Sequence, residues 1–305
     1  MPRVLVIMGA TATGKSGLAL ELAAATGREL ISADSRQVYL GLRVGTAQPT
    51  AAERARVTHH GIDFLPLAQR WSAQAFATAA RALLARSDRP PAIVVGGTGF
   101  YIEALCEGLF PASIPAGPLS ALRRELQALD GPALHARLAG LDPATAARLH
   151  PHDRQRLARA LEVCLATGRP LSAHHAAGRE RPTGFAWERV LLSRERGELQ
   201  ARIAARLDAM LASGWIEEVA ALLAAGADPA APGLQTLGYP EVVAYLRGGL
   251  DREALRARIL LRTRQYAKRQ ETWWRHRGRP DCVLDPRAAD TPARLRALLE
   301  SAGPP

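Results

Sequence analysis

The sequence is poor in cysteine and in long apolar runs. Its three cysteines, Cys106, Cys164 and Cys282, lie far apart and form no CxxC pair, which excludes a disulfide framework and a cysteine zinc site. The apolar run before Gly9 is too short for a signal peptide or a membrane span. We therefore expect reduced thiols in a cytoplasmic protein that makes no membrane contact.

Lysine is also scarce: it occurs only at Lys15 and Lys268, although lysine and arginine together number 40. The net charge of +11 favours a polyanionic partner, but an arginine-rich genome composition would explain it equally well. The distribution favours the partner, because residues 251–280 carry ten basic residues against three acidic ones, a net charge of +7.

Strand and helix patterns alternate in much of the chain. The segments at 3–8, 29–34, 92–95 and 187–193 read as strands, and helical patterns follow at 14–25 and from about 100. This alternation predicts an α/β fold with a doubly wound parallel sheet of the P-loop type. Functional groups in such folds gather at the carboxyl ends of the strands.

The pattern is purely helical between about 114 and 178. We therefore expect a small all-helical insertion domain at 114–182, between a first part of the core at 1–113 and a second part at 183–305. The second part shows helical patterns near 194–213, 217–225, 240–247 and 252–275. It ends in a polar tail with one short helix near 292–299.

The segment GATATGKS, residues 9–16, matches G-x-x-x-x-G-K-[ST] in full and is called the phosphate loop below. In this motif backbone amides and the helix N-terminus bind phosphate oxygens, Lys15 adds charge, and Ser16 can ligate Mg²⁺. Most such loops hold a nucleoside triphosphate. The motif itself recognises only an oligophosphate, so the identity of the ligand has to come from elsewhere in the chain.

Two other segments follow strands at the same expected edge. Asp34 opens DSRQVY, and its carboxylate either contacts Mg²⁺ through water or acts as a base toward a nucleophile; capping of the next helix is the structural alternative. GGTGFY, residues 96–101, allows close backbone approach to a ligand, and Thr98 offers a hydroxyl. His59, His60 and Asp63 make only a weak metal site, because adjacent histidines chelate poorly.

The helical segment up to residue 275 has two kinds of face. Leu255, Ile259, Tyr266 and Trp273 recur at helical spacing and are expected in the core. Arg258, Arg262, Gln265 and Arg269 recur at the same spacing and form a cationic stripe suited to a phosphate backbone. A solvated face is the alternative interpretation of this stripe.

The combination of motifs is more specific than any one of them. In order they are GATATGKS, SADSRQVYLGLRVGTAQP, HHGID, VVGGTGFYIEAL, DRQRLARALEV, LGYPE and TRQYAKRQETWWR. From about residue 3 to 275 the chain thereby resembles the bacterial tRNA dimethylallyltransferases. The resemblance implies transfer of a dimethylallyl group from dimethylallyl pyrophosphate to the exocyclic N6 of the adenosine 3′-adjacent to the anticodon. The phosphates would then be the pyrophosphate of an isoprenoid donor, and ATP would not be a substrate.

The resemblance also implies a role for individual residues and partners. It gives catalysis to Asp34, Thr98 and Arg123, with Asp34 as the base and Mg²⁺ as the cofactor held by Ser16. It gives the donor pyrophosphate to Gly9, Ala10, Thr11, Ala12, Thr13, Gly14, Lys15, Ser16, Arg202 and Arg206. It gives the anticodon stem-loop of tRNA to Asp34, Ser35, Arg36, Gln37, Gln155, Arg156, Leu157, Ala158, Arg159, Arg262, Lys268, Arg269, Gln270, Trp273 and Arg275. The protein is expected to act as a monomer.

The sequence departs from the family pattern at three positions. Ala10 stands where the family usually has proline, at a variable position of the loop, so phosphate binding should survive. Gln235 and Pro240 occupy places where some members carry arginine, so the resemblance does not extend to base contacts from that stretch.

The residues alone leave three other functions open. An isopentenyltransferase acting on free adenosine nucleotides would need neither the helical insertion nor the basic helix. A P-loop nucleotide kinase would consume ATP. A noncatalytic RNA-binding protein with a relict loop would tolerate a change of Asp34.

Overall fold

The computed structural model describes residues 1–109, 119–179 and 181–300 of the chain. The chain divides into two compact units, one of Met1–Cys106 with Pro182–Pro305 and one of Glu107–Arg181. The first is built around a β-sheet, and the described part of the second contains only helices. The domain border expected between 113 and 114 lies outside the described residues.

One parallel sheet organises the larger unit. Its strand order is β3-β2-β4-β1-β5-β6, so β1 lies between β4 and β5, with Val6 opposite both Val94 and Arg189. Every pairing is parallel, which confirms the predicted α/β class. The strands are β1 (Arg3–Gly9), β2 (Leu30–Ser32), β3 (His59–His60), β4 (Ile93–Gly96), β5 (Ala186–Leu192) and β6 (Cys282–Leu284).

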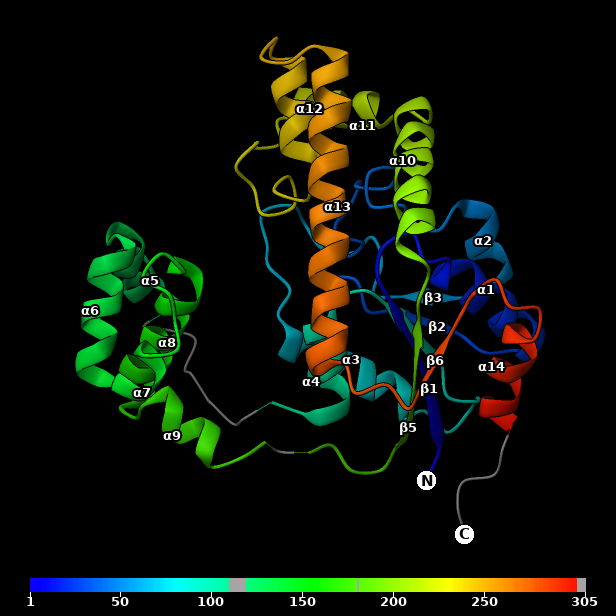
Figure 1. The fold of residues 1–305 in the computed structure, drawn as a ribbon, viewed down its shortest axis with the longest axis horizontal. Coiled ribbons are helices and arrows are strands. Elements are labelled where there is room, and N and C mark those ends of the chain that lie inside the picture. The colour runs from blue at the N-terminus through cyan, green and yellow to red at the C-terminus, as the bar shows by residue number, and fades with distance from the viewer. Residues whose placement is uncertain (110–118, 180, 301–305) are drawn as a thin grey trace. The chain divides into compact units, whose positions relative to one another are not determined.

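Helices cover both faces of this sheet, and Figure 1 shows α1 and α14 on one side, α3 and α4 on the other, and α10–α12 beyond the carboxyl ends of the strands. The helices of this unit are α1 (Lys15–Thr26), α2 (Ala51–Arg56), α3 (Ala73–Leu84), α4 (Gly99–Glu107), α10 (Arg196–Ala212), α11 (Trp215–Ala224), α12 (Tyr239–Leu246), α13 (Arg252–Arg277) and α14 (Thr291–Glu300). None of the helices in the described ranges has both the length and the apolar character that crossing a bilayer requires.

The strands β1, β2 and β4 are buried on both faces, which explains why they read as continuous apolar runs. Val4 to Met8 are fully buried, and Leu5 and Ile7 share one face with Ile93 and Val190. That face packs against α1 and α14. Burial on two sides fixes the direction and the end of β1, and therefore the place where the phosphate loop begins.

The segment expected as a polar tail is part of this packing, so it is not a tail, whereas the short helix expected near 292–299 is confirmed as α14. Strand β6 pairs with β5, with Val283 opposite Leu191, and Leu295 and Leu299 of α14 are buried in the same cluster as Leu5. A three-residue strand between arginines and aspartates leaves little periodicity to detect.

The smaller unit is a helical bundle with a core of its own. Its helices are α5 (Leu119–Ala128), α6 (Gly131–Leu141), α7 (Pro143–Ala146), α8 (Arg154–Thr167) and α9 (Leu171–Ala176). Leu126, Leu134, Leu138, Leu157 and Leu161 are buried together there. Asp130 caps α6 by accepting a hydrogen bond from the backbone N–H of Ala133 at 2.8 Å.

Candidate active site

The phosphate loop connects β1 to α1 in a conformation with two left-handed residues. Gly14 has φ +99° and Ala12 has φ +63°; the first is natural for glycine, whereas the second is strained and needs support from its surroundings. The carbonyl oxygens on this loop are engaged by side chains: Ala10 by Thr13 Oγ1 and Lys15 Nζ, at 2.9 and 3.1 Å. The loop therefore turns these oxygens away from an anion, while the first turn of α1 leaves backbone N–H groups unpaired.

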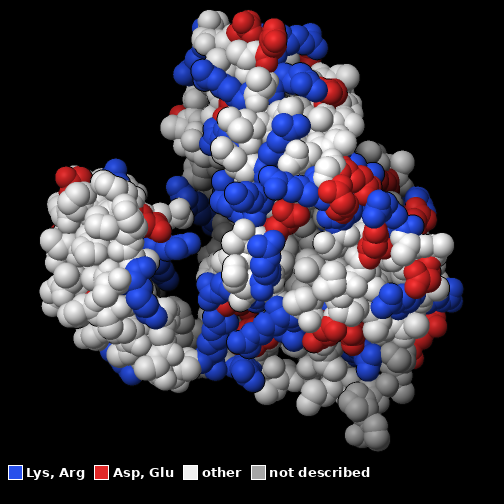
Figure 2. Space-filling view, in the orientation of Figure 1, with Lys and Arg blue, Asp and Glu red and all other residues white. Residues whose placement is uncertain are grey.

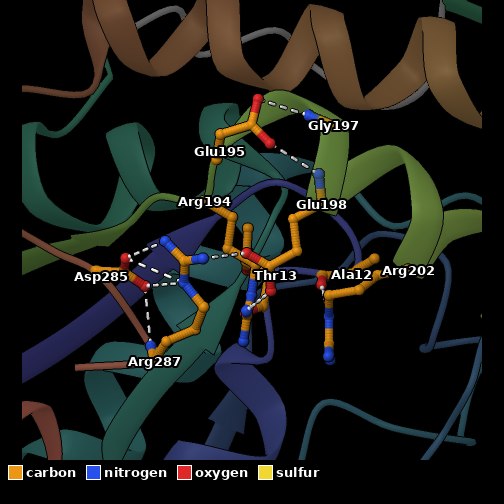
Figure 3. A network of polar contacts seen from close by, with 9 residues as sticks. All are labelled: Ala12, Thr13, Arg194, Glu195, Gly197, Glu198, Arg202, Asp285 and Arg287. Atoms are coloured by element: carbon orange, nitrogen blue, oxygen red, sulfur yellow. Dashed lines mark hydrogen bonds and ion pairs between the residues drawn. The ribbon is translucent and has the colours of Figure 1, made fainter. Parts of the chain in front are cut away.

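Two arginines that are distant in the sequence hold the carbonyl oxygens of Ala12 and Thr13 (Figure 3). Arg202 Nε donates to Ala12 O at 2.9 Å, and Arg194 Nε donates to Thr13 O at 2.7 Å. Arg206 follows one turn after Arg202 on α10, and its Nη1 donates to Thr11 Oγ1 at 3.2 Å. Arg202 and Arg206, both predicted from the resemblance, thus lie against the loop.

Lys15 is half-buried beside the loop. Burial is the main cause that lowers its pKa to about 8, the positive charge of Arg206 lowers it further, and the negative charge of Asp34 acts in the opposite sense. Burial also lowers the pKa of Arg206, again opposed by Asp34. Three cationic side chains, Lys15, Arg202 and Arg206, therefore line one cleft, which suits a ligand with several negative charges.

The side chain of Gln270, on α13, forms hydrogen bonds with the phosphate loop and with the turn after β4 instead of facing solvent. Its Oε1 accepts a hydrogen bond from the backbone N–H of Thr11 at 2.8 Å, and its Nε2 donates to Gly97 O at 2.9 Å. A Cβ at position 97 would collide with this amide, so glycine is needed there. The side chain of Gln270 is buried and contacts the phosphate loop, while the tRNA contact expected from the sequence stays a prediction.

Asp34 and Thr98 lie at the carboxyl ends of the neighbouring strands β2 and β4. Asp34 Oδ1 accepts a hydrogen bond from the backbone N–H of Arg36 at 2.8 Å, which orients the carboxylate. Thr98 Oγ1 accepts from the backbone N–H of Ser35 at 3.0 Å and donates to Ser35 Oγ at 3.4 Å. These contacts bring together the two segments that the sequence placed at one edge of the sheet.

Two hollows meet at Asp34. The cleft, of about 420 Å³, is lined by Gly14, Lys15 and Ser16 of the phosphate loop and reaches Asp34. An apolar cavity of about 100 Å³ is lined by Ile203, Leu207, Met210, Trp215, Leu237 and Ile259. Both hollows are bordered by Thr11, Ala12, Asp34, Arg206 and Tyr266. One molecule with an anionic end and a small apolar end can therefore occupy both and pass beside the carboxylate of Asp34.

Tyr266 differs from its expected place in the core. Leu255 and Ile259 of α13 are buried as expected, but Tyr266 borders the cleft and the cavity. Burial raises the pKa of its phenol, and the negative charge of Asp34 raises it further, so the phenol stays protonated. Trp274 is the buried core residue, whereas its neighbour Trp273 is half-buried and packs edge-on against Phe100, with ring centroids 6.4 Å apart.

The basic face of α13 is exposed, and Figure 2 shows lysine and arginine side chains gathered over this helix. Lys268, Arg269 and Arg275 are exposed, and the guanidinium of Arg269 lies 5.9 Å from the ring centroid of Tyr266. Arg262 forms an ion pair with the buried carboxylate of Glu241. Glu241 also accepts from the N–H of Gly238 at 3.1 Å, so Arg262 stabilises the start of α12.

The remaining predicted residues of the larger unit lie in the turn after Asp34. Ser35 is half-buried and Arg36 is exposed. Gln37 is half-buried, and its Nε2 donates to Ala47 O at 2.8 Å while its Oε1 accepts from Ser32 Oγ at 2.8 Å. Gln37 thus fixes the loop between β2 and α2.

The other predicted residues belong to the smaller unit, which is described by itself. Arg123 and Arg159 both pair with Glu162, at 3.1 and 3.0 Å. Gln155 and Arg156 are exposed and Ala158 is half-buried. Leu157 is fully buried in the core of this unit, so its side chain is not available to contact tRNA, which corrects the prediction for that residue.

Ser16 fits the expected Mg²⁺ ligand in its chemistry. Its hydroxyl is exposed to the cleft at the start of α1 and makes no hydrogen bond to a described residue. Mg²⁺ commonly takes one or two protein oxygens and completes its shell with phosphate oxygens and water. No group of three or more acidic, histidine or cysteine side chains gathers into a metal site within the described ranges; His60 instead contacts Glu29 at 2.8 Å, and Asp63 accepts from Gly41 N at 2.9 Å.

A family model described as IPP transferase matches residues 37–277. The tRNA dimethylallyltransferase of Rhodospirillum centenum is 48% identical over 281 residues, covering 90% of this chain and 88% of that protein. The tRNA dimethylallyltransferase of Halorhodospira halophila is 47% identical over 288 residues, covering 92% and 91%.

Solved structures show the same likeness. A eukaryotic dimethylallyltransferase acting on tRNA superposes with a TM-score of 0.83 and 27% identity, covering 98% of this chain and 78% of that one. The tRNA isopentenylpyrophosphate transferase of Bacillus halodurans superposes with a TM-score of 0.66 and 32% identity, covering 93% and 90%.

Proposed function

This chain belongs to the IPP transferase family, and from that premise we propose that it is an enzyme that transfers a dimethylallyl group from dimethylallyl pyrophosphate to tRNA. The acceptor is the exocyclic N6 of the adenosine 3′-adjacent to the anticodon, and pyrophosphate is released. The observation that carries this proposal is the position of Asp34, where the cleft with the phosphate loop meets the small apolar cavity.

The two hollows suit the two ends of this donor. Its pyrophosphate binds to the free backbone N–H groups at the start of α1 and to Lys15, Arg202 and Arg206. Its five-carbon chain enters the apolar cavity of about 100 Å³. An engineered cavity of about 150 Å³ binds benzene, so the smaller cavity has room for a branched five-carbon group and too little for a purine.

Ser16 is the residue that would hold Mg²⁺ in this complex. The ion, when bound with pyrophosphate, neutralises part of the negative charge that grows on the leaving group. Lys15, with its three donors on a flexible stem, supplies a positive charge of the protein itself to the same oxygens.

Asp34 acts as the base toward the acceptor amine. The lone pair of that amine is delocalised into the purine ring, so removal of a proton as the new C–N bond forms makes the amine a better nucleophile. The N–H of Arg36 holds Asp34 Oδ1, which leaves the other carboxylate oxygen free to accept the proton. A positioned base of this kind contributes about 10²- to 10⁴-fold to the rate.

Thr98 supports the leaving group from the other strand. Its Oγ1 accepts the N–H of Ser35, and its hydroxyl donates a long hydrogen bond of 3.4 Å to Ser35 Oγ, which it would exchange for a hydrogen bond to a donor oxygen. Negative charge grows on that oxygen as the C–O bond breaks, and a preorganised donor stabilises it.

The tRNA binds by its anticodon stem-loop to the exposed basic face of α13, with Lys268, Arg269 and Arg275, and to exposed residues of α8 in the helical unit, Gln155, Arg156 and Arg159. The target base leaves the stack to reach Asp34, which costs on the order of a few kcal/mol. We propose that the enzyme acts as a monomer in the cytoplasm, where its three free cysteines would stay reduced.

A matrix of donors and acceptors tests this function. The protein is incubated with Mg²⁺ and either dimethylallyl pyrophosphate or ATP as donor, and either unmodified tRNA or AMP as acceptor. We expect an adduct only with dimethylallyl pyrophosphate and tRNA. An adduct on AMP would assign the protein to enzymes acting on free nucleotides, and consumption of ATP would assign it to the kinases.

A further inference from the structure

The phosphate loop contacts a network of charged side chains that extends to the residues after β6 (Figure 3). Ala12 and Gly14 are both left-handed, with Thr13 buried between them. The carbonyl oxygen of Thr13 accepts from Arg194 Nε at 2.7 Å. The guanidinium Nη2 of Arg194 also lies 3.4 Å from the place that a Cβ on Gly14 would occupy, so Arg194 packs directly against the N-terminus of α1.

Arg194 is itself held in place by an acidic partner on the side away from the loop. Its side chain is 8% exposed, and it forms an ion pair with Glu198, one turn further along α10. Glu198 Oε2 lies 3.0 Å from Arg287 Nη1. Arg287 in turn donates from Nη2 to Asp285 Oδ2 at 2.7 Å. These four alternating charges run without a gap from the loop to the residues that follow β6.

We propose that Arg194 is a positioning residue for pyrophosphate binding, and that Arg287 fixes it through Glu198. This inference rests on the proposed function for the identity of the donor. Arg194 does not border the cleft, so it acts through the loop and not by contact with the substrate. The segment after β6, outside the residues matched by the family model, is thereby part of the machinery of the donor site.

The physical reason lies in the dipoles of the loop. An anion binds only when the N–H groups face it and the carbonyl oxygens point away, and a left-handed alanine costs about 1 kcal/mol or more, so the bound form needs support. A guanidinium can hold a carbonyl oxygen with Nε and a carboxylate with Nη1 at the same time, in a fixed geometry. Lysine carries the same charge but lacks this fork.

The test uses Arg194→Lys, Arg287→Gln and the double variant in the full chain. Isothermal titration with inorganic pyrophosphate and Mg²⁺ measures the site without any turnover. We expect Arg194→Lys to weaken pyrophosphate about tenfold, the loss of one charged hydrogen bond. We expect Arg287→Gln to weaken it less, and the double variant to be no weaker than Arg194→Lys, because both changes act through one route.

A second readout separates this role from general stability. The KM for dimethylallyl pyrophosphate should rise by the same factors, while the Kd for tRNA stays within about twofold in every variant. Arg296→Gln is the matched control, because the partner of Arg296 among the described residues is Glu300, within α14, and the change should leave both constants unchanged. Arg287 is half-exposed, so its variant stays folded even if Arg194→Lys does not.

Each part of the proposal has a result that would overturn it. Unchanged pyrophosphate affinity in Arg194→Lys would overturn the positioning role. If the two single losses of pyrophosphate affinity multiply in the double variant, Arg287 does not act through Arg194. An equal loss of affinity in Arg296→Gln would show an effect of net charge alone. The wild-type protein and the variants could bind pyrophosphate with the expected relative affinities while the wild-type protein transfers no dimethylallyl group. In that case the proposed function fails and the role of Arg194 stands.

Discussion

Gln270 and Thr11 are 259 positions apart in the sequence, yet Gln270 Oε1 accepts the backbone N–H of Thr11 at 2.8 Å. The same amide donates to Gly97 O at 2.9 Å. One side chain of α13 therefore ties the phosphate loop to the turn that carries Thr98. The helix that carries the exposed basic face therefore also contacts the phosphate loop.

Replacement of Gln270 by glutamate tests this link. Glutamate keeps the acceptor for Thr11 but loses the donor to Gly97 O and adds a negative charge beside the anion site. We expect the KM for dimethylallyl pyrophosphate to rise about tenfold or more, with tRNA affinity measured by filter binding nearly unchanged. Loss of tRNA affinity with an unchanged donor KM would instead show that Gln270 contacts tRNA, as expected from the sequence.

The pKa of Lys15 predicts the pH dependence of donor binding. Because burial and Arg206 lower this pKa to about 8, the ammonium is present below pH 8 and is lost as the pH rises through that value. The affinity for dimethylallyl pyrophosphate should therefore be constant below about pH 8 and fall above it. Steady-state kinetics across this range measures the effect.

Lys15→Arg is the control for this profile, because a guanidinium remains charged throughout the range. Its donor KM should be higher than that of the wild type but independent of pH. The same decline above pH 8 in Lys15→Arg would assign the titration to another group.

The apolar cavity predicts the chain length of the donor. Met210 is one of its lining residues and is only half-buried, so Met210→Ala should enlarge the cavity with little effect on folding. We expect the kcat/KM ratio for a ten-carbon over a five-carbon isoprenyl pyrophosphate to rise at least about tenfold. Leu211→Ala, on the same helix but outside the cavity lining, should leave the ratio unchanged. An equal rise in Leu211→Ala would show that the isoprenyl group binds outside this cavity.

Arg262 and Arg269 were both predicted to contact tRNA and both are exposed, but of the two only Arg262 forms an ion pair with a buried carboxylate among the described residues. Arg269 is exposed, so Arg269→Gln should weaken tRNA binding and reduce the slope of log affinity against log salt by about one. Arg262 neutralises the buried carboxylate of Glu241, so Arg262→Gln should lower the free energy of unfolding by about 1–3 kcal/mol. Equal salt slopes and equal stabilities in the two variants would contradict this distinction.

The sequence predicted the parts of the site that depend on local pattern. The end of a buried strand is visible in the sequence as the end of an apolar run. The loop after β1, Asp34 after β2 and Thr98 after β4 could therefore be predicted to lie at one edge of a parallel sheet. The same rule applied to β5 would have found Arg194, two residues beyond its last residue, Leu192.

Contacts between distant segments could not be predicted in this way. Arg194 and Thr13 are 181 positions apart, and nothing in either segment indicates the other. The face of α13 was misjudged for a related reason: helical spacing shows which residues share a face, but only the tertiary structure shows that Tyr266 borders a cleft and that Gln270 is buried.

Nucleoside mass spectrometry of unmodified tRNA tests the central claim most directly. The tRNA is incubated with Mg²⁺, dimethylallyl pyrophosphate and either the wild-type protein or Asp34→Asn, and the adduct is mapped by digestion. We expect a dimethylallyl group on N6 of the adenosine 3′-adjacent to the anticodon, formed at least about 10²-fold more slowly by Asp34→Asn, which binds tRNA normally. Absence of the adduct with the wild-type protein, or its formation at an equal rate with Asp34→Asn, would contradict the account.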